Sequence, residues 1–483
     1  MSRLRVIILI LAFFSTVPAQ GIRNRAERPQ CDTVALRGLL MVLQEPVPQP
    51  LRLKPNEKID TPTTVWRQEN PEGNLEDFLA QEKVPPEAWK YYDRGTGEFR
   101  YSPDRTLELA LENGDAELKA LRMNWFDGFA LTQLRDLTPV LLKHENLELW
   151  IVAGGKDFKT VRRAIKDLPQ AARNRIRITS VKNEDIVNPW AQDGSKPLRE
   201  PGNTAIPPVV SHRSHKGLPN NLLAVRALAK TRGVLAHQSL FEFDGGNVIV
   251  GEKNIFVGSE VLFRAMTRFE ITRSEAIAAL SAEFGKPVIE VGFTETTRIP
   301  PKQVDFHIDL TMAIARNHKT GREVVLVDSQ KMGLKLLLNN RDAASLPADD
   351  RAFVEALIGE GQGHEHENLT AARLQDMAQN LKLKRFVERE QRLDHVARQM
   401  QQLGYEVVRV PGLADGRDTV VNYTNAIFSA KTAIISKTGF PVLDAAAQGI
   451  FKDLGYDTVE ASVVQKSFCV AGGIRCLLET YRH

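Results

Sequence analysis

The chain has 483 residues, 42% of them hydrophobic, which is enough for a large buried core and for two to four average domains, or one large domain with an appendage. Its 64 basic and 60 acidic residues give a net charge of only +4. No dense basic run or basic face with interleaved aromatic residues accompanies this small excess, which argues against a nucleic-acid partner.

The first 19 residues have the pattern of a secretory signal peptide. Arg3 and Arg5 precede an apolar run over residues 6–14, and small residues at 17–19 stand where a signal peptidase would cleave. The apolar run is well short of the ~20 residues that a membrane-spanning helix needs. We therefore expect a secreted or periplasmic protein, cleaved near Ala19 and without stable membrane insertion.

Residues 20–146 are expected to form an N-terminal extension or a small partner-binding module, because their first part is rich in Pro, Gln and Asn. Within this region the leucine spacing predicts a helix over residues 104–121 and a second helix over residues 131–142. From residue 147 onward, short apolar runs alternate with amphipathic segments, which predicts one α/β domain over residues 147–483. A charged stretch at about residues 349–402 is expected to be a helical insertion in that domain.

The alternation gives a definite set of predicted elements in the domain. Strands are expected at residues 147–153, 175–181, 207–210, 247–250, 254–257, 288–291, 307–314, 323–327, 406–410, 426–436 and 458–464. Helices are expected at residues 157–165, 222–230, 274–284 and 442–454.

Three cysteines are few for an exported protein. A disulfide between Cys31 and Cys469 would leave Cys476 unpaired, although the sequence alone does not establish this pairing. Cys476 follows the glycine pair Gly472-Gly473, which lets the backbone turn tightly and bring a small side chain close to a ligand. Cys476 is therefore the candidate nucleophile, with a buried structural thiol as the alternative.

A cysteine nucleophile needs a proton donor and acceptor and groups that hold the substrate. His307 and Asp309 are two residues apart in a predicted strand, so both side chains can point into one pocket. Asp193 follows another strand, and the turn Asp244-Gly245-Gly246-Asn247 lies beside a third. The alternatives are structural: a hydrogen-bonded pair for His307 and Asp309, a turn or cap for Asp193, and a plain hairpin for the glycine turn.

A thiolate, an imidazole and two carboxylates suit a substrate that is a planar cation. Carboxylates accept hydrogen bonds bidentately from a guanidinium group and can hold its central carbon in front of a sulfur atom. The thiolate would attack that carbon, and the histidine would protonate the departing nitrogen and then activate water against the covalent thiouronium.

Two other uses of a cysteine fit the sequence less well. Only seven residues follow Cys476, too few for a substantial helix such as the one that normally starts at the cysteine of a cysteine protease. No Cys-x-x-Cys or His-x-x-x-His spacing around the candidate residues indicates zinc. The tract His364-Glu365-His366-Glu367 lies in the charged stretch and is interpreted as a solvated face.

Four motifs in chain order carry a family resemblance. They are Trp190-x-Gln192-Asp193, Asp244-Gly245-Gly246-Asn247, His307-x-Asp309 and Gly472-Gly473-x-x-Cys476. Together they resemble the guanidino-group-modifying superfamily, which contains protein-arginine deiminases, agmatine and arginine deiminases, dimethylarginine hydrolases and amidinotransferases. The first motif looks most like the catalytic domain of protein-arginine deiminases. The resemblance covers roughly residues 147–483 and implies a five-bladed, pseudo-symmetric α/β propeller, the pentein fold, with the site along its axis.

The resemblance also implies roles for individual residues. Asp193 and Asp309 would clamp the guanidinium group, His307 would be the general acid and base, and Cys476 the nucleophile. The residues expected to bind the substrate or to shape the wall of its site are Gln192, Asp244, Gly246, Asn247, Asn425 and Arg475.

The sequence departs from the family pattern at two places. Arg475 precedes the cysteine where many relatives have histidine, which puts substrate-specific contacts in doubt. Gly194-Ser195-Lys196-Pro197 stands where animal protein-arginine deiminases carry acids that help bind activating calcium. The expected chemistry requires no cofactor, no metal site is expected, and calcium is not indicated.

The expected function is that of an exported hydrolase that converts peptidyl-arginine to peptidyl-citrulline and ammonia. Export and the N-terminal region favour an arginine-containing peptide or protein as partner over a small guanidino compound. A small-molecule deiminase, an amidinotransferase of the same superfamily and a catalytically inactive extracellular binding protein are the alternatives. All of these depend on whether the distant candidate residues meet in space.

Overall fold

In the computed structural model the described residues are 92–93, 98–99 and 108–482, apart from 116, 127–128, 182–188, 200–208, 212–223, 225–226, 229–230, 232–235, 240, 270, 293–302, 340–380, 415–418, 439 and 465–471. The expected signal peptide, Cys31, Cys469 and the His364–Glu367 tract lie outside these residues. No helix among the described residues is both long and apolar enough to cross a membrane.

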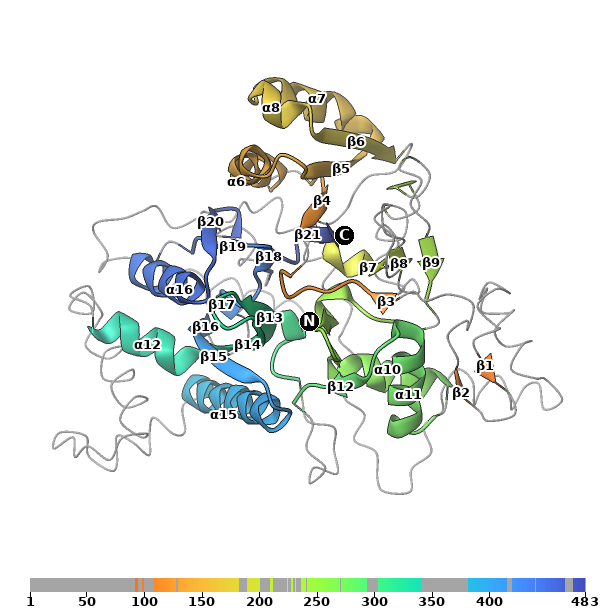
Figure 1. Ribbon diagram of the computed structural model, residues 1–483, viewed down its shortest axis with the longest axis vertical. Helices are drawn as coiled ribbons and strands as arrows, with labels where there is room; N and C mark the ends of the chain where they lie inside the picture. Colours follow the sequence, from red (N-terminus) through yellow and green to blue (C-terminus); the bar gives the residue numbers. More distant parts are fainter. Residues whose placement is uncertain are drawn as a thin grey trace, which may run out of the picture.

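The protein has a mixed α/β fold built from repeated sheet units (Figure 1). Five sheets of the described chain contain three or four strands. The strands in sheet order are β21 (Leu478–Arg482), β4 (Leu118–Asn124), β5 (Glu148–Gly154) and β6 (Ile176–Val181); β3 (Glu108–Leu109), β7 (Ser195–Arg199), β8 (Val209–Ser211) and β9 (Ala236–Gln238); β10 (Val248–Val250), β11 (Ile255–Val257) and β12 (Val288–Glu290); β13 (Met312–Asn317), β14 (Arg322–Ser329) and β15 (Glu406–Pro411); and β18 (Ile427–Ser429), β19 (Thr432–Ser436) and β20 (Asp457–Ala461). Each sheet contains a unit in which one strand pairs antiparallel with a second and the second pairs parallel with a third: β21-β4-β5, β7-β8-β9, β10-β11-β12, β13-β14-β15 and β18-β19-β20. The strands β6 and β3 extend the first and second of these sheets.

Helical crossovers join the two parallel strands, as a parallel connection requires. They are α6 (Ala130–Lys143), α10 (Ser259–Phe269) with α11 (Arg273–Phe284), α12 (Gln330–Asn339) with α15 (Leu381–Gln402), and α16 (Pro441–Asp453). In the β8–β9 crossover the described residues 224, 227, 228 and 231 are helical. The remaining elements are α7 (Phe158–Lys166), α8 (Gln170–Arg173), the 3₁₀ turns η1 (Gly155–Asp157), η2 (Gln192–Gly194), η3 (Gly245–Asn247) and η4 (Ile308–Leu310), and the small pairs β1 (Tyr92–Asp93) with β2 (Glu98–Phe99) and β16 (Leu413–Ala414) with β17 (Thr419–Val421).

Local sequence signals explain why the crossover helices begin and end where they do. Thr272 caps α11 in a reciprocal capping box with Glu275, and Gly285 ends it in a left-handed conformation (φ 79°). Pro441 occupies the first turn of α16, where its missing N–H costs nothing. Each crossover then buries an apolar stripe on its sheet; in α6 the stripe includes Leu134 and Leu137.

The alternation predicted from residue 147 onward is confirmed for most strands and helices, but the prediction of a helix over residues 104–121 is wrong. This segment contains β3 and most of β4, and β4 lies between β21 and β5. Because β4 is buried on both faces, its sequence lacks the alternation that would have identified a strand. The domain boundary expected at residue 147 therefore falls inside a four-stranded sheet.

Three further expectations are corrected. Residues 307–314 do not form one strand: the 3₁₀ turn η4 comes first, and β13 begins at Met312. Residues 426–436 form a hairpin of β18 and β19, with Ala430 at positive φ (43°) between them. In the stretch expected to be a helical insertion, residues 349–380 lie outside the described chain. The other part, α15, is a crossover helix that packs into its sheet through Leu393, Val396 and Met400.

Candidate active site

The candidate residues meet because they occupy equivalent places in the five sheets. In each sheet the chain enters the first strand, β7, β10, β13, β18 or β21, directly from a short turn. Figure 1 shows the five sheets disposed around the middle of the molecule, with β21, β7, β13 and β18 on the inner side. The turns are residues 192–194, 245–247, 308–310, 422–425 and 474–477.

His307 lies between two carboxylates. Its Nδ1 atom is 3.8 Å from Oδ1 of Asp193, and its Nε2 atom is 3.8 Å from Oδ2 of Asp244. Gly246 backs the ring so closely that a Cβ atom on this residue would lie 2.5 Å from Nδ1. The glycine turn therefore shapes the site by allowing the imidazole to sit against its backbone. Asn247 is directed elsewhere, to the carbonyl of Phe306, to which its Nδ2 donates a hydrogen bond (3.2 Å).

Cys476 lies in the same place, buried with 2% of its surface exposed and without a disulfide. One ligand atom each of Cys476, His307 and Asp309 falls within 4.8 Å of the other two. Nδ2 of Asn425 donates to the sulfur (3.4 Å), and Oδ1 of Asn425 accepts from the backbone N–H groups of Arg475 (2.7 Å) and Cys476 (3.3 Å). Asn425 thus fixes the turn that presents the sulfur.

Asp309 is fully buried and is held from behind. Oriented by its partners, the amide of Gln192 donates from Nε2 to Oδ2 of Asp309 (2.9 Å) and accepts from Nε of Arg475 (2.6 Å). Nε of Arg475 is also 3.8 Å from Oδ2 of Asp309. Gln192 and Arg475 therefore contact this carboxylate, while its Oδ1 atom has no hydrogen-bond partner within the described protein.

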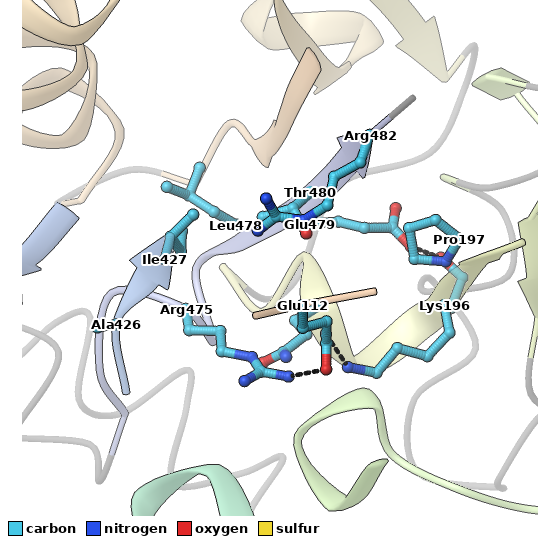
Figure 2. A pocket seen from close by; sticks show the side chains of 12 residues that line it. Glu112, Lys196, Pro197, Ala426, Ile427, Arg475, Leu478, Glu479, Thr480 and Arg482 are labelled. Atoms are coloured by element: carbon cyan, nitrogen blue, oxygen red, sulfur yellow. Dashed lines mark hydrogen bonds and ion pairs between the residues drawn. The ribbon is translucent and has the colours of Figure 1, made fainter. Parts of the chain in front are cut away.

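Two charged residues that the sequence analysis did not assign to the site lie next to it. Figure 2 shows Glu112 between Arg475 and Lys196: it pairs with Nη2 of the arginine (2.6 Å) and with Nζ of the lysine (2.8 Å). The three residues line a cavity that Gln192 also borders. Glu112 lies in the segment misassigned to a helix, and nothing in its spacing indicates burial. For Lys196 the one available signal was its position in a stretch that departs from the family pattern.

The site gives His307 a strong preference for the charged form. Burial alone would lower the pKa of His307, but the carboxylate of Asp193 and the contacts with Asp244 and Cys476 outweigh it and raise that pKa well above its usual value. Burial raises the pKa of Asp193 to about 7, against the opposing effect of the His307 charge. Burial also raises the pKa of Asp309, against Arg475 and His307.

Cys476 is a poor thiolate in this environment. Burial, reinforced by the charge of Asp309 and only partly opposed by His307, raises the pKa of its thiol to about 11. A cation between Asp193 and Asp309 would neutralise the carboxylates that oppose ionisation and would favour the thiolate. The site is therefore suited to a substrate that brings its own positive charge.

Among the described residues, His307, Asp309 and Cys476 form the group whose ligand atoms lie close enough together to hold a metal ion. Metal binding requires a thiolate and a neutral imidazole. The pKa values of Cys476 and His307 are both raised, so both groups favour the protonated form. A metal ion would have to displace a proton from each. The donor set fits a resident metal poorly.

Comparison with known proteins identifies the fold. No protein-family profile and no curated protein sequence match the chain. Among solved structures, a protein provisionally named agmatine deiminase shares 13% sequence identity with the chain, covers 78% of it and 96% of its own length, and has a TM-score of 0.52. Agmatine deiminases from C. jejuni (13% identity, 77% and 95% coverage, TM-score 0.46) and Enterococcus faecalis (12%, 77% and 95%, 0.47) are also similar.

With the structure that has the TM-score of 0.52 the chain shares its fold over most of its length, so the resemblance that the four motifs carry is confirmed at the level of the fold.

Proposed function

We propose that the protein is a cysteine-dependent deiminase that hydrolyses a guanidino group. The observation that carries this proposal is the convergence of Cys476, His307, Asp193 and Asp309, which come from three separate turns into one buried site. A thiol, an imidazolium and two carboxylates around one place match the charge and shape of a guanidinium group, and no cofactor is needed for the reaction.

The first half of the reaction forms a carbon–sulfur bond. Asp193 and Asp309 accept hydrogen bonds from the guanidinium, and its charge favours the Cys476 thiolate. The thiol of Cys476 loses its proton to solvent as the cation binds, and the thiolate attacks the central carbon. His307, protonated by virtue of its carboxylate neighbours, donates a proton to the departing nitrogen, which leaves as ammonia when the carbon–nitrogen bond breaks.

The second half returns the enzyme to its starting state. Neutral His307 takes a proton from water, and the water oxygen attacks the thiouronium carbon. The carbon–sulfur bond breaks, the hydroxyl proton of the adduct returns to the departing Cys476 sulfur, and the product carries a ureido group. Asp244, 3.8 Å from Nε2 of His307, stabilises the imidazolium at both ends of this cycle.

Peptidyl-arginine is the proposed substrate, and a small guanidino compound is the second candidate. The pattern of residues 1–19 and the region before β3 favour a macromolecular substrate outside the cell. The structure with the TM-score of 0.52 is provisionally named an agmatine deiminase, which supports the second candidate. An amidinotransferase would differ by requiring an acceptor amine, and an inactive binding protein would differ by leaving Cys476 unreactive.

The test is to incubate the purified protein with an arginyl peptide, free arginine, agmatine and methylated arginine, with and without glycine as acceptor amine, and to assay ureido product and ammonia. We expect turnover of at least one compound without glycine, lost in Cys476→Ala and insensitive to a metal chelator. Absence of turnover with all four, or equal turnover by Cys476→Ala, would refute the proposal. Absence of Cys476 labelling by a haloacetamidine would instead support the inactive binding protein.

We also propose that the five sheets are the blades of one five-bladed propeller, in which β21 completes the blade formed by β4, β5 and β6. A separate proposal is that the chain is exported after cleavage near Ala19. The pairing of β21 with β4 supports the first point, because it joins the two ends of the described domain in one sheet. N-terminal sequencing of the protein recovered from outside the cytoplasm tests the second. An intact N-terminus there would contradict it.

A further inference from the structure

The backbone just before His307 is held on one side by amide groups. Nε2 of Gln303 donates to the carbonyl of Phe306 (2.9 Å) and to Oδ1 of Asn247 (2.6 Å). Nδ2 of Asn247 donates to the same carbonyl (3.2 Å). The residue directly before His307 is thus fixed to the glycine turn.

A guanidinium from a different element holds the other side. Arg389 of α15 binds Asp305 side-on, with Nε donating to Oδ1 (3.2 Å) and Nη2 to Oδ2 (2.9 Å). Nη2 also donates to Oδ2 of Asp328 on β14 (2.9 Å). Oγ1 of Thr311, directly before β13, donates to Oδ2 of Asp305 (2.9 Å). Asp305 is therefore tied both to α15 and to the far end of the segment that carries His307.

This ion-pair cluster is buried, so its geometry is tightly constrained. The side chains of Arg389, Asp305 and Asp328 expose 9%, 7% and 0% of their surface. A bidentate guanidinium–carboxylate pair fixes direction as well as distance, and breaking a buried pair leaves an uncompensated charge. The backbone at Asp305 consequently has little freedom while Arg389 is in place.

We propose that Arg389 is a positioning residue for catalysis, which acts through Asp305 to fix the backbone from which His307 projects into the site. The inference rests on the proposed deiminase function. It makes α15 a support of the catalytic histidine, in addition to its role as a crossover helix.

Asp309 has separate anchors, and this gives the proposal a distinctive signature. Nδ2 of Asn422 donates to the carbonyl of Leu310 (2.6 Å), and Oγ1 of Thr424 donates to that of Asp309 (3.4 Å). Loosening the Arg389 contact should therefore disturb His307, which transfers protons, more than Asp309, which holds the substrate. The chemical step should suffer while substrate binding is largely retained.

The experiment compares Arg389→Lys and Asp305→Asn with the control Arg409→Gln. Lysine keeps the charge of Arg389 but loses the fork, and asparagine keeps the shape of Asp305 but loses its charge. Arg409 also joins α15 to its surroundings, through Asp394 (2.5 Å) and Glu390 (3.1 Å). It donates to the backbone carbonyl of Asp328 (2.9 Å) but does not contact Asp305, so it tests whether loosening α15 elsewhere in this region has the same effect. We expect kcat to fall by about 10- to 100-fold in both test variants, with KM within about threefold, and to stay within about threefold in the control.

Hydrogen exchange provides a readout that does not depend on activity. The amides of residues 303–307 should exchange faster in both test variants than in the wild type and in Arg409→Gln, while those of residues 309 and 310 should change less. Unchanged kcat together with unchanged exchange would overturn the proposal, as would a rise in KM equal to the fall in kcat. A wild-type protein that turns over no guanidino compound would refute the proposed function, and the exchange pattern would still decide whether Arg389 fixes this segment.

Discussion

Cys476 has to ionise in surroundings that oppose ionisation. Its sulfur is buried near the carboxylate of Asp309, and the imidazolium of His307 compensates only in part. Desolvation and the negative charge of Asp309 both favour the neutral thiol, so Cys476 is protonated and unreactive in the free site. Under the proposed function, the thiol becomes reactive only when the cationic substrate is bound.

The raised pKa of Cys476, about 11, predicts how the thiol responds to pH without substrate. The reactive thiolate fraction should rise about tenfold per pH unit below that pKa. We expect the rate of Cys476 alkylation by uncharged iodoacetamide to increase from pH 7 to pH 10 without levelling off. The Cys476→Ala variant reports the background from the other cysteines. A plateau below pH 8 would show that the thiol is already ionised in the free protein.

The raised pKa of Asp193, about 7, predicts a pH dependence of substrate binding. Only the ionised carboxylate accepts both N–H groups of a guanidinium, and the raised pKa means that ionisation is complete only above pH 7. Binding to Cys476→Ala of the guanidino compound that the wild type turns over should strengthen about tenfold per pH unit from pH 5 to pH 7 and then level off. Titration calorimetry measures this. In the double variant Cys476→Ala/Asp193→Asn the affinity should show no change of slope near pH 7. A change of slope that persists there would belong to the titration of another group.

At the scale of single elements, α15 joins the core of its sheet to the site. Leu393 has no exposed surface and packs in the cluster formed with β13 and β14. Leu393→Ala should destabilise the protein by about 2–5 kcal/mol, because it removes apolar burial and leaves a cavity. Gln391→Ala, at an exposed position of the same helix, should change stability by less than about 0.5 kcal/mol. Urea unfolding of both variants checks this, and equal midpoints would show that α15 is peripheral.

The elements that could be predicted from sequence were those with local signals. The apolar runs of β5 and β6, bounded by polar segments, and the capped helix α11 needed no knowledge of their neighbours. The strand β4 could not be predicted as one, because its burial on both faces depends on β21, which lies more than 350 residues away in the sequence. The 3₁₀ turn η4 replaced the predicted strand start because Asn422, from another turn, takes up the carbonyl of Leu310.

The same distinction holds for the site. Cys476, His307, Asp193 and Asp309 could be singled out because they stand in glycine-rich or strand-adjacent motifs, and the structure brings them together. Glu112 and Arg389 could not, since a charged residue in a polar segment gives no sign of burial until its partner is placed. The carboxylates and guanidinium groups that support the site are therefore the part that only the fold reveals.

At the scale of the whole molecule, the pairing of β4 with β21 joins segments from the two ends of the domain. Arg122 of β4 lies opposite Glu479 of β21, and Nε of the arginine is 2.8 Å from Oε2 of the glutamate. Both side chains are buried, with 1% exposed. Arg122 also donates to the carbonyl of Ala191, next to Gln192, and Ser195 of β7 donates to Glu479. This ion pair therefore links the closing strand pair to the neighbouring sheet and to a turn of the site.

The cost of this link can be measured by a double-mutant cycle. Arg122→Met should destabilise the protein by about 3–5 kcal/mol, because it leaves the Glu479 carboxylate buried without its cation, and Glu479→Leu should cost a similar amount for the opposite reason. The double variant should lose much less than the sum, since neither charge then remains. It should still fall below the wild type, because the hydroxyls of Ser195 and Tyr481 lose their acceptor. Additive losses in urea unfolding would show that the two ends of the domain are not coupled through this pair.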